Sequence, residues 1–351
     1  MSELRFEDVT IRYGQARRGV TAVDRVSLTI PDSQVVGLVG ESGSGKSTLA
    51  RGAVGLTPLH SGRILLDGRP VHHRGGGRRP VQMIFQDPYS SLDPRMTVGA
   101  TIAETVPRRR PGGQPVDRCR ETARLLDMVG LEAARAHDYP AQLSGGQRQR
   151  VALARALGAA PEVVIADEIT SALDVSVQGA VLNLVRDLQR ETGTSMLFIS
   201  HNLAVVRYVA TSIAVMYLGR IVEHGPTADV LNEPQHPYTR DLLAALPDPG
   251  HTGLSVLGPL PGDHQDPAVV EAAQAEPADP HHPPAGCRYH PRCPIGPLTR
   301  PDRDICRTVE PTSRHSNRAA CHFAADLAGA TARTSPSQAR PDRTPTEGHH
   351  P

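Results

Sequence analysis

The chain has 351 residues, a formal net charge of +1 and 3% aromatic residues, with no tryptophan. This length exceeds one ordinary domain, so we expect a large globular unit with an appendage. The balanced charge and the scarcity of aromatic rings argue against a nucleic-acid-binding protein. No run approaches the roughly 18 apolar residues of a membrane-spanning helix, and the N-terminal residues do not resemble a secretion signal.

The N-terminal residues are predicted to form strands. Apolar residues alternate along residues 4–9 and 23–30, as in half-buried antiparallel strands. Residues 35–39 form a short uninterrupted apolar run of the kind found in buried strands. A hairpin with its turn at Asp67-Gly68 is expected over residues 61–70. This part of the chain therefore predicts an antiparallel β subdomain beside a first buried strand.

A glycine-rich loop follows the buried strand and leads into a helix. Residues 40–47 read Gly-Glu-Ser-Gly-Ser-Gly-Lys-Ser, a pattern whose backbone N–H groups surround nucleotide phosphates. Lys46 would reach the phosphate oxygens, and the Ser47 hydroxyl would bind Mg²⁺. Lys46 is also the one lysine among 38 basic residues, which indicates a site that accepts only a compact ammonium group. The residues expected to bind ATP are Gly40, Glu41, Ser42, Gly43, Ser44, Gly45, Lys46, Ser47 and Thr48.

The composition changes from about residue 92 to residue 158. Loops rich in proline and arginine surround an amphipathic helix that is expected over residues 118–129. Cys119 lies on this helix and is expected to be an ordinary buried thiol. We interpret the region as an inserted α-helical subdomain.

Three further apolar runs indicate more buried strands. They cover residues 81–85, 163–166 and 195–199, and the last two are separated by a helix expected over about residues 175–191. Strands that alternate with helices predict a mainly parallel sheet. The fold class is therefore α/β.

Polar side chains follow each of these three strands, at the edge where α/β sheets bind ligands. Asp167 and Glu168 end the second strand, so Asp167 would hold Mg²⁺ and Glu168 would polarise the attacking water as general base. Gln86 could bind the metal or that water, and His201 could contact the γ-phosphate. Taken singly, a histidine or glutamine at a strand end is more often structural, and an acidic pair can be a solvated loop. These residues indicate a catalytic site because they occur together with the phosphate loop.

A second anion-binding element is predicted at residues 143–147, which read Leu-Ser-Gly-Gly-Gln before a helix. Ser144 is a good N-cap, and Gly145 and Gly146 let a ligand approach the helix N-terminus. Gln147 completes the motif. A single nucleotide rarely needs two anion sites in one chain, so a head-to-tail dimer that uses one from each protomer is expected.

With these motifs the chain resembles ABC transporter ATPases over about residues 3–235. The resemblance implies a P-loop NTPase (RecA-like) core with an antiparallel β subdomain and an inserted α-helical subdomain at about residues 92–158. It also implies that Tyr13 stacks on adenine. Ile169 departs from the proline that usually follows the acidic pair. The matching motifs are the Walker A motif at 40–47, the Walker B motif at 163–168, the Q-loop at Gln86, the signature motif at 143–147, the D-loop with Ser171 and Asp174, and the switch histidine at His201.

Finer features resemble the oligopeptide, dipeptide and nickel importers, namely residues 85–94, residues 170–176 and the His-Pro-Tyr-Thr-Arg run at residues 236–240. This resemblance implies an ATP-hydrolysing subunit that powers the import of peptides, with nickel or another small solute as the alternative cargo. An exporter ATPase is a weaker interpretation. An ABC ATPase that acts on nucleic acid or the ribosome is also weaker, because no long coiled coil, tandem domain or basic arm is present.

The same resemblance implies the partners and the location of the chain. A second ABC ATPase subunit, identical or related, would complete the nucleotide sites. Two membrane-spanning permeases and an extracytoplasmic solute-binding protein would complete the transporter. The chain would then lie at the cytoplasmic face of the inner membrane as a peripheral subunit, with no nucleic acid bound.

The C-terminal part is expected to form a small cysteine-containing extension over residues 236–325, followed by a disordered tail at residues 326–351. Residues 247–286 have the composition of a linker. The extension contains Cys287, Cys293, Cys306 and Cys321, and four thiolates can hold zinc or a [4Fe–4S] cluster. The absence of a tight Cys-x-x-Cys pair weakens the zinc interpretation, and the resemblance to importers implies the cluster. Zinc and free thiols stay open as alternatives.

Overall fold

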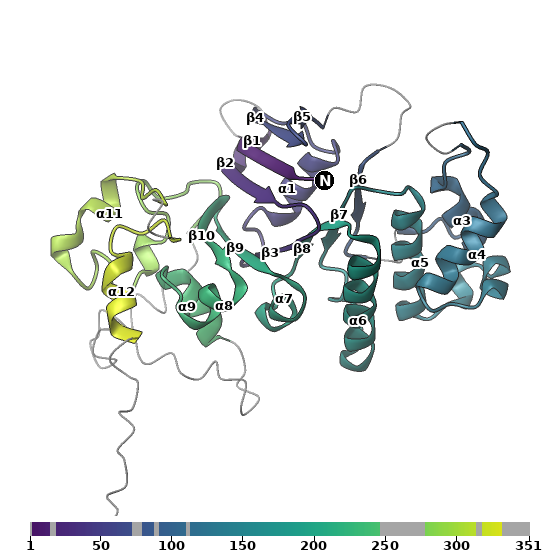
Figure 1. Ribbon diagram of the computed structural model, residues 1–351. Coiled ribbons are helices and arrows are strands. Elements are labelled where there is room, and N and C mark those ends of the chain that lie inside the picture. The colour runs from purple at the N-terminus through teal and green to yellow at the C-terminus, as the bar shows by residue number, and fades with distance from the viewer. Residues whose placement is uncertain are drawn as a thin grey trace, which may run out of the picture.

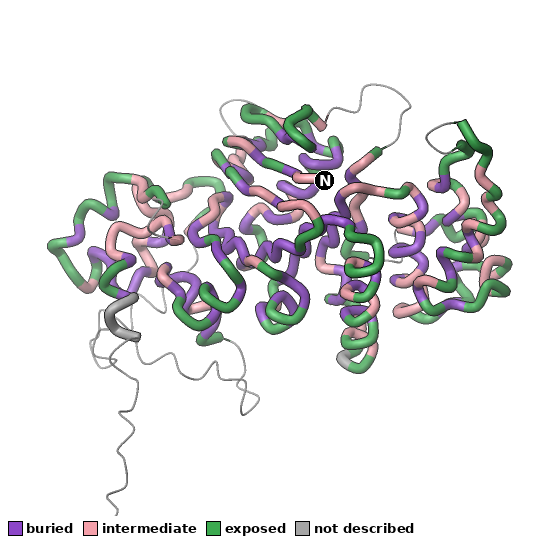
Figure 2. Tube along the Cα trace, viewed as in Figure 1, coloured by how far each residue is buried: buried purple, intermediate pink, exposed green. Residues whose placement is uncertain are grey.

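The computed structural model describes residues 2–14, 19–71, 79–87, 91–109, 113–245, 278–313 and 318–331. In Figure 1 the chain passes from an antiparallel sheet through a second sheet, with a helical subdomain at one end and the C-terminal region at the other. Most of the predicted linker and residues 332–351 lie outside the described residues. Figure 2 shows buried residues concentrated along the central strands, while the outer helices carry most of the exposed ones.

The first sheet is antiparallel, with the strand order β2-β1-β4-β5. Inward-pointing side chains such as Leu4 and Phe6 alternate with more exposed neighbours, as the sequence predicts. The β4–β5 hairpin turns at Asp67 and Gly68, whose φ angles of 50° and 73° suit a tight turn. The strands are β1 (Leu4–Tyr13), β2 (Val20–Ile30), β4 (Ser61–Leu66) and β5 (Arg69–Pro70).

The second sheet has the strand order β10-β9-β3-β8-β7-β6. Its strands are parallel except for β10, which is antiparallel to β9. The predicted parallel core is therefore confirmed, and β9 and β10 extend it beyond the runs recognised in the sequence. The strands are β3 (Val35–Val39), β6 (Val81–Ile84), β7 (Val163–Asp167), β8 (Ser195–Ile199), β9 (Ser212–Tyr217) and β10 (Arg220–Pro226).

The two faces of the parallel sheet belong to different hydrophobic cores. Val36 and Leu38 point toward α1 (Lys46–Ala53) and the antiparallel sheet, whereas Val35 and Val39 face the opposite core. This alternation follows from the two-residue period of a strand. Helices α6 (Val175–Thr192) and α7 (Leu203–Val209) contribute to the opposite core. The nucleotide loop between β3 and α1 is thereby fixed between two packed layers.

The helical subdomain is built from three capped helices and two short 3-10 turns, in the region where the sequence predicts it. Side-chain oxygens of Thr97, Asp117 and Ser144 accept hydrogen bonds from the first turns of the three helices. Cys119 is exposed, so its prediction as a buried thiol is wrong. It lies in the first turn of its helix, whose buried residues begin only at Thr122. The elements are α3 (Val98–Thr105), α4 (Arg118–Met128), η1 (Ala133–His137), η2 (Pro140–Gln142) and α5 (Gly145–Gly158).

The C-terminal region packs against the β10 end of the parallel sheet (Figure 1). Tyr289 is buried, and Ala319 forms an isolated β-bridge with Glu223 of β10. A disordered tail is predicted from residue 326, but residues 326–331 are helical and Leu327 is fully buried, so the prediction is wrong for these six residues. The helices here are α8 (Thr227–Asn232), α9 (Pro237–Ala244), η4 (His290–Arg292), η5 (Pro301–Arg303), α11 (Ile305–Thr308) and α12 (Ala324–Thr331). None of the described helices is long and apolar enough to cross a membrane.

Candidate active site

The phosphate loop is packed too tightly for side chains at two of its glycines. A Cβ atom at Gly40 would lie 2.1 Å from the carbonyl oxygen of Met216, and one at Gly45 would lie 2.3 Å from that of Ala22. Gly45 also has a φ of 105°, which disfavours any other residue. The Gly219 N–H donates a hydrogen bond to the Ser44 carbonyl at 2.8 Å. Strands β2 and β9 and the turn after β9 therefore hold the loop in shape, while Ser42 and Gly43 stay exposed.

Lys46 lies buried at the centre of the loop. Its Nζ donates hydrogen bonds to the Gly40 and Glu41 carbonyl oxygens, both at 2.8 Å. Burial lowers the pKa of Lys46, while the carboxylates of Glu168, Asp167 and Glu41 act in the opposite direction. The ammonium group is therefore held at the position where the phosphate-loop pattern predicts it.

The side chains predicted at the strand ends meet beside this loop. The Ser47 hydroxyl donates to Asp167 Oδ1 at 3.0 Å, and Gln86 Nε2 donates to Glu168 Oε2 at 2.9 Å. His201 Nδ1 lies 3.3 Å from Glu168 Oε1. Burial raises the pKa of Asp167, and this outweighs the hydrogen bond from Ser47. One cluster thus joins the ends of β6, β7 and β8 to the start of α1.

Glu168 has an unusual backbone conformation. Its φ is 47°, in the left-handed region that costs a non-glycine residue about 1–2 kcal/mol. Its N–H donates to the Ile199 carbonyl at 3.0 Å, and the Ser171 hydroxyl donates to its carbonyl at 2.8 Å. Ile169, where the family usually has proline, is buried in the hydrophobic core. These contacts stabilise the conformation that directs the Glu168 carboxylate toward Gln86 and His201.

The signature residues form a separate element on the helical subdomain. The Ser144 side chain accepts a hydrogen bond from the Gln147 N–H at 3.3 Å, and Gln147 Oε1 accepts one from the Ser144 N–H at 2.9 Å. A Cβ at Gly146 would meet Val177 of α6 at 2.6 Å, and one at Gly145 would meet Leu173, between Ser171 and Asp174, at 3.6 Å. Among the described residues, no hydrogen bond or ion pair connects Ser144–Gln147 with the phosphate loop. The signature motif thus packs on the D-loop of its own chain.

Tyr13 lies at the rim of the loop. Its side chain is exposed, and its hydroxyl is 3.5 Å from the Thr48 hydroxyl, in the first turn of α1. The ring therefore borders the site from the antiparallel sheet.

Two residues that sequence analysis did not assign to the site also contact it. The Tyr238 hydroxyl accepts a hydrogen bond from the Glu41 N–H at 2.8 Å. Arg292 Nη1 lies 3.2 and 3.4 Å from the two carboxylate oxygens of Glu41. Tyr238 belongs to the His-Pro-Tyr run, but nothing in that run indicates a contact with the loop. Arg292 carries no sequence signal, since it is one of many arginines.

The four C-terminal cysteines line one small cavity, together with buried apolar side chains such as Ile295. All four are free thiols. Burial raises the pKa of Cys287 and of Cys321 to about 12, and neighbouring thiols add to the shift. In the part of the chain that the structure describes, no three histidine, cysteine, aspartate or glutamate side chains gather closely enough to hold a metal ion. The cavity therefore does not fit a single zinc ion.

Comparisons with known proteins agree with this geometry. Residues 23–171 match the model of the family "ABC transporter", and residues 222–296 match "Oligopeptide/dipeptide transporter, C-terminal region". The chain is 44% identical over 327 residues to the "Probable peptide ABC transporter ATP-binding protein y4tS" of Sinorhizobium fredii, covering 89% of this chain and 85% of that protein. This chain belongs to the family of peptide ABC transporter ATP-binding proteins. As in the sequence-based prediction, it is an ABC-type ATPase.

Other relatives of this ABC ATPase differ in how much of their length it spans. It is 49% identical over 241 residues to the glutathione import ATP-binding protein GsiA of Salmonella typhimurium, covering 67% of this chain but 38% of that protein. The ATP-binding cassette MJ0796, solved as a dimer in a post-hydrolysis state with ADP and Pi, has a TM-score of 0.57 at 27% identity. That match covers 64% of this chain and 98% of MJ0796. The cbiO1 protein of Clostridium perfringens gives the same TM-score and identity, covering 66% of this chain and 90% of its own.

Proposed function

We propose that this ATPase subunit powers the import of peptides across the cytoplasmic membrane from its cytoplasmic face. The observation that carries the proposal is the combination, in one chain, of a complete nucleotide site with a C-terminal region of the oligopeptide/dipeptide type at residues 222–296. Relatives that cover most of the chain are named for peptide transport, and a shorter match is named for glutathione import. Nickel, the alternative cargo, is not supported by these relatives.

For ATP binding, the loop N–H groups and Lys46 are proposed to hold the β- and γ-phosphates. The residues that would hold the accompanying Mg²⁺ are Ser47, Asp167 and Gln86. The Ser47 hydroxyl lies 3.0 Å from Asp167 Oδ1, which supports a shared ion, and Gln86 follows the neighbouring strand β6. The metal would neutralise charge that develops on the phosphate oxygens during transfer. Tyr13 would stack on the adenine ring.

For hydrolysis, Glu168 is proposed to polarise the attacking water as general base. Gln86 and His201 contact its two carboxylate oxygens, and would orient it and the γ-phosphate. The left-handed backbone at Glu168 supports this role, because strained conformations of this kind concentrate at active sites.

The signature residues are proposed to act on the nucleotide of a second ATPase subunit. Ser144 and Gly145 lie on the helical subdomain and, within the described ranges, make no polar contact with their own phosphate loop. Such an arrangement supports a head-to-tail pair in which each signature motif completes the partner's site. The D-loop residues Ser171 and Asp174 would lie between the two sites. The partner would be a copy of this chain or a related ATPase.

A groove between the ATP-binding core and the helical subdomain is the proposed docking site for the permeases. It is lined by Leu56, Met83 and Phe85 from the core side and by Leu92 and Arg155 from the helical subdomain. Leu56 and Phe85 are large apolar side chains that stay exposed. Phe85 directly precedes Gln86, so a permease segment seated there would contact the residue that touches the general base. The transporter would further include an extracytoplasmic solute-binding protein.

The cysteine cavity is proposed to hold a [4Fe–4S] cluster. Such a cluster takes one cysteine thiolate on each of its four irons, and Cys287, Cys293, Cys306 and Cys321 all line one cavity. The cluster would supply four covalent links that tie the C-terminal segments together. The raised pKa values of the Cys287 and Cys321 thiols imply that binding of the cluster would release protons. Iron and sulfide analysis after anaerobic purification tests this, and stoichiometric zinc without iron would contradict it.

The cargo is tested with the transporter reconstituted in vesicles together with its permeases and binding protein. Uptake of a labelled dipeptide, a labelled tetrapeptide, glutathione and radioactive nickel is compared between the wild-type chain and Lys46→Ala. We expect uptake of at least one peptide to depend on ATP and to be lost in Lys46→Ala. Uptake of nickel alone would overturn the peptide assignment.

A further inference from the structure

Glu41, the second residue of the phosphate loop, is held from three directions. Its N–H donates to the Tyr238 hydroxyl at 2.8 Å, and its carbonyl accepts from Lys46 Nζ at 2.8 Å. Its carboxylate pairs with Arg292 at 3.2 Å. Two of these three contacts come from residues beyond the ATP-binding core. The start of the loop is therefore positioned by the C-terminal region as well as by its own strand and helix.

The charge of Glu41 makes its pairing with Arg292 important for ligand binding. A carboxylate in a phosphate loop repels a polyphosphate, and the interaction is strong at short range when solvent screens it poorly. The side chains of Glu41 and Arg292 retain 36% and 18% of their exposure, so the pair is partly shielded. Because the guanidinium offsets the Glu41 carboxylate, that carboxylate opposes the positive charge of Lys46 and the loop N–H groups less strongly.

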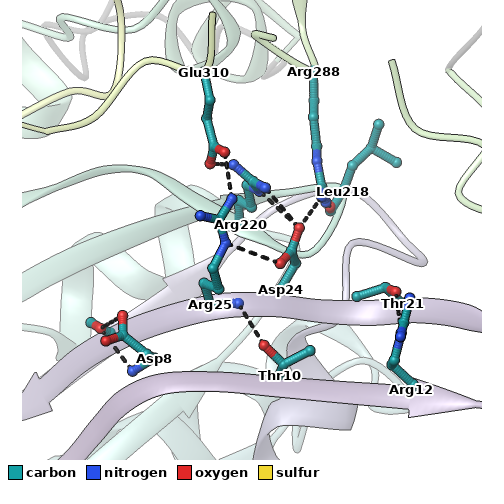
Figure 3. Close-up of polar contacts among 11 residues, drawn as sticks. Asp8, Thr10, Arg12, Thr21, Asp24, Arg25, Leu218, Arg220, Arg288 and Glu310 are labelled. Atoms are coloured by element: carbon teal, nitrogen blue, oxygen red, sulfur yellow. Dashed lines mark hydrogen bonds and ion pairs between the residues drawn. The ribbon is translucent and has the colours of Figure 1, made fainter. Parts of the chain in front are cut away.

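The C-terminal region that supplies Arg292 is firmly docked. The rings of Tyr217, at the end of β9, and Tyr238 and Tyr289 pack together with centroids 4.5–5.5 Å apart. Figure 3 shows a second attachment, in which Arg288 and Arg220 both reach Asp24 of β2. Arg288 also donates to the Leu218 carbonyl, next to Gly219, which holds the loop at Ser44. Arg292 therefore belongs to a segment that these contacts anchor to the two sheets.

We propose that Arg292 is a positioning residue for ATP binding, which neutralises Glu41 and, with Tyr238, fixes the start of the phosphate loop. The proposal rests on the assignment of this loop as the ATP site. It assigns to the C-terminal region a direct part in setting nucleotide affinity. Since Arg292 adjoins Cys293, the same contact links the cysteine cavity to the nucleotide.

The test is a double-mutant cycle on the full chain, in which each substitution removes one charge. Dissociation constants for a fluorescent ATP analogue and melting temperatures are measured for wild type, Arg292→Ala, Glu41→Gln and the double variant. Arg318→Ala is the matched control, because this arginine also ties the C-terminal region to the core, through Asp229 of α8 at 2.6 Å, but does not reach the loop. Lys46→Ala reports whether the loop is the ATP site.

We expect Arg292→Ala to weaken ATP binding about three- to tenfold. Glu41→Gln should bind at least as tightly as wild type, and the double variant should recover most of the lost affinity, since the repelling charge is gone. Arg318→Ala should bind ATP normally even if its melting temperature falls. Unchanged affinity in Arg292→Ala, or no recovery in the double variant, overturns the proposal. If Lys46→Ala binds ATP like wild type, the site assignment itself fails instead.

Discussion

The phosphate loop and the cysteine cavity are both small sites, but they are specified in different ways. The loop is a continuous run at residues 40–47, and Gly40 and Gly45 set its backbone against Met216 and Ala22. The four cysteines are dispersed between residues 287 and 321, and they meet because helices and turns around Tyr289 and Leu327 pack against the sheet. A continuous motif carries its own geometry, whereas a dispersed set depends on the packing of everything between its members.

The two regions also differ in how exposed and how charged they are. The nucleotide site combines a buried Lys46 and a buried Asp167 with more accessible groups, since Ser42, Gly43 and His201 are exposed. The cysteine cavity is closed and apolar, and burial keeps its thiols neutral. The contact between Arg292 and Glu41 joins them. The following predictions test how far the two regions are separate.

The largest effect is expected at the general base. Glu168→Gln should lower the turnover number for ATP about 10²- to 10⁴-fold, since the amide cannot accept a proton from water. ATP affinity should stay near that of wild type. Hydrolysis is measured with the assembled transporter, and Glu191→Gln, an exposed site on α6, serves as control. Near-normal turnover would remove Glu168 from this role.

A smaller effect is expected from distorting the loop itself. Gly45→Ala should weaken ATP binding roughly 10- to 50-fold, because the added Cβ would lie 2.3 Å from the Ala22 carbonyl at a φ of 105°. Gly43→Ala is a matched comparison, since its φ is 79° but no atom lies within 4 Å of the new Cβ. Equal losses of ATP affinity in both variants would show that the backbone conformation, and not the close contact of the new Cβ, causes the loss.

The packing between the two regions should respond to pH through Asp241. Burial raises its pKa from 3.8 to about 7, and Tyr289 donates a hydrogen bond to it. Between about pH 4 and pH 7 the unfolded chain releases this proton and the folded chain keeps it, so stability is lost as pH rises to 7. The free energy of unfolding of Asp241→Asn, taken relative to that of wild type, should therefore rise by roughly 1–2 kcal/mol between pH 5 and pH 8. Urea unfolding at both pH values measures this, and an equal difference at the two pH values would contradict it.

The smallest effect is expected in the cysteine cavity. In the chain without bound iron, Cys293→Ser should destabilise the fold by about 1 kcal/mol, because it buries a hydroxyl among apolar side chains. ATP affinity should change less than in Gly45→Ala. Cys119→Ser, at an exposed site, should leave the melting temperature unchanged. A loss of ATP binding in Cys293→Ser as large as in Gly45→Ala would mean that the two regions are not separable.

Much of the nucleotide site could be predicted before any coordinates. Asp167, Glu168, Gln86 and His201 lie at or just after the ends of apolar strands, and parallel strands bring such ends to one edge. Lys46 begins the helix that follows another of these strands. Four of the six strands of the parallel-type sheet followed from the apolar runs, whereas β9 and β10 were not recognised. Predictions that rested on one local property of the sequence were less successful. Cys119 was expected to be buried because it lies on an amphipathic helix, but its place in the first turn leaves it exposed.

The sequence by itself therefore determined the ATPase family, the α/β core and the glycine-rich loop between β3 and α1, because these depend on short motifs and on the periods of strands and helices. The tertiary structure alone decided that Tyr238 and Arg292 hold Glu41. It also decided that Asp24 forms ion pairs with Arg220 of β10 and Arg288 of the C-terminal region. It further decided that α12 extends over residues 326–331. Glu41 is separated from Tyr238 by 197 positions and from Arg292 by 251 positions, and contacts over such separations leave no local pattern in the sequence. They arise only when the C-terminal region packs on the completed sheet.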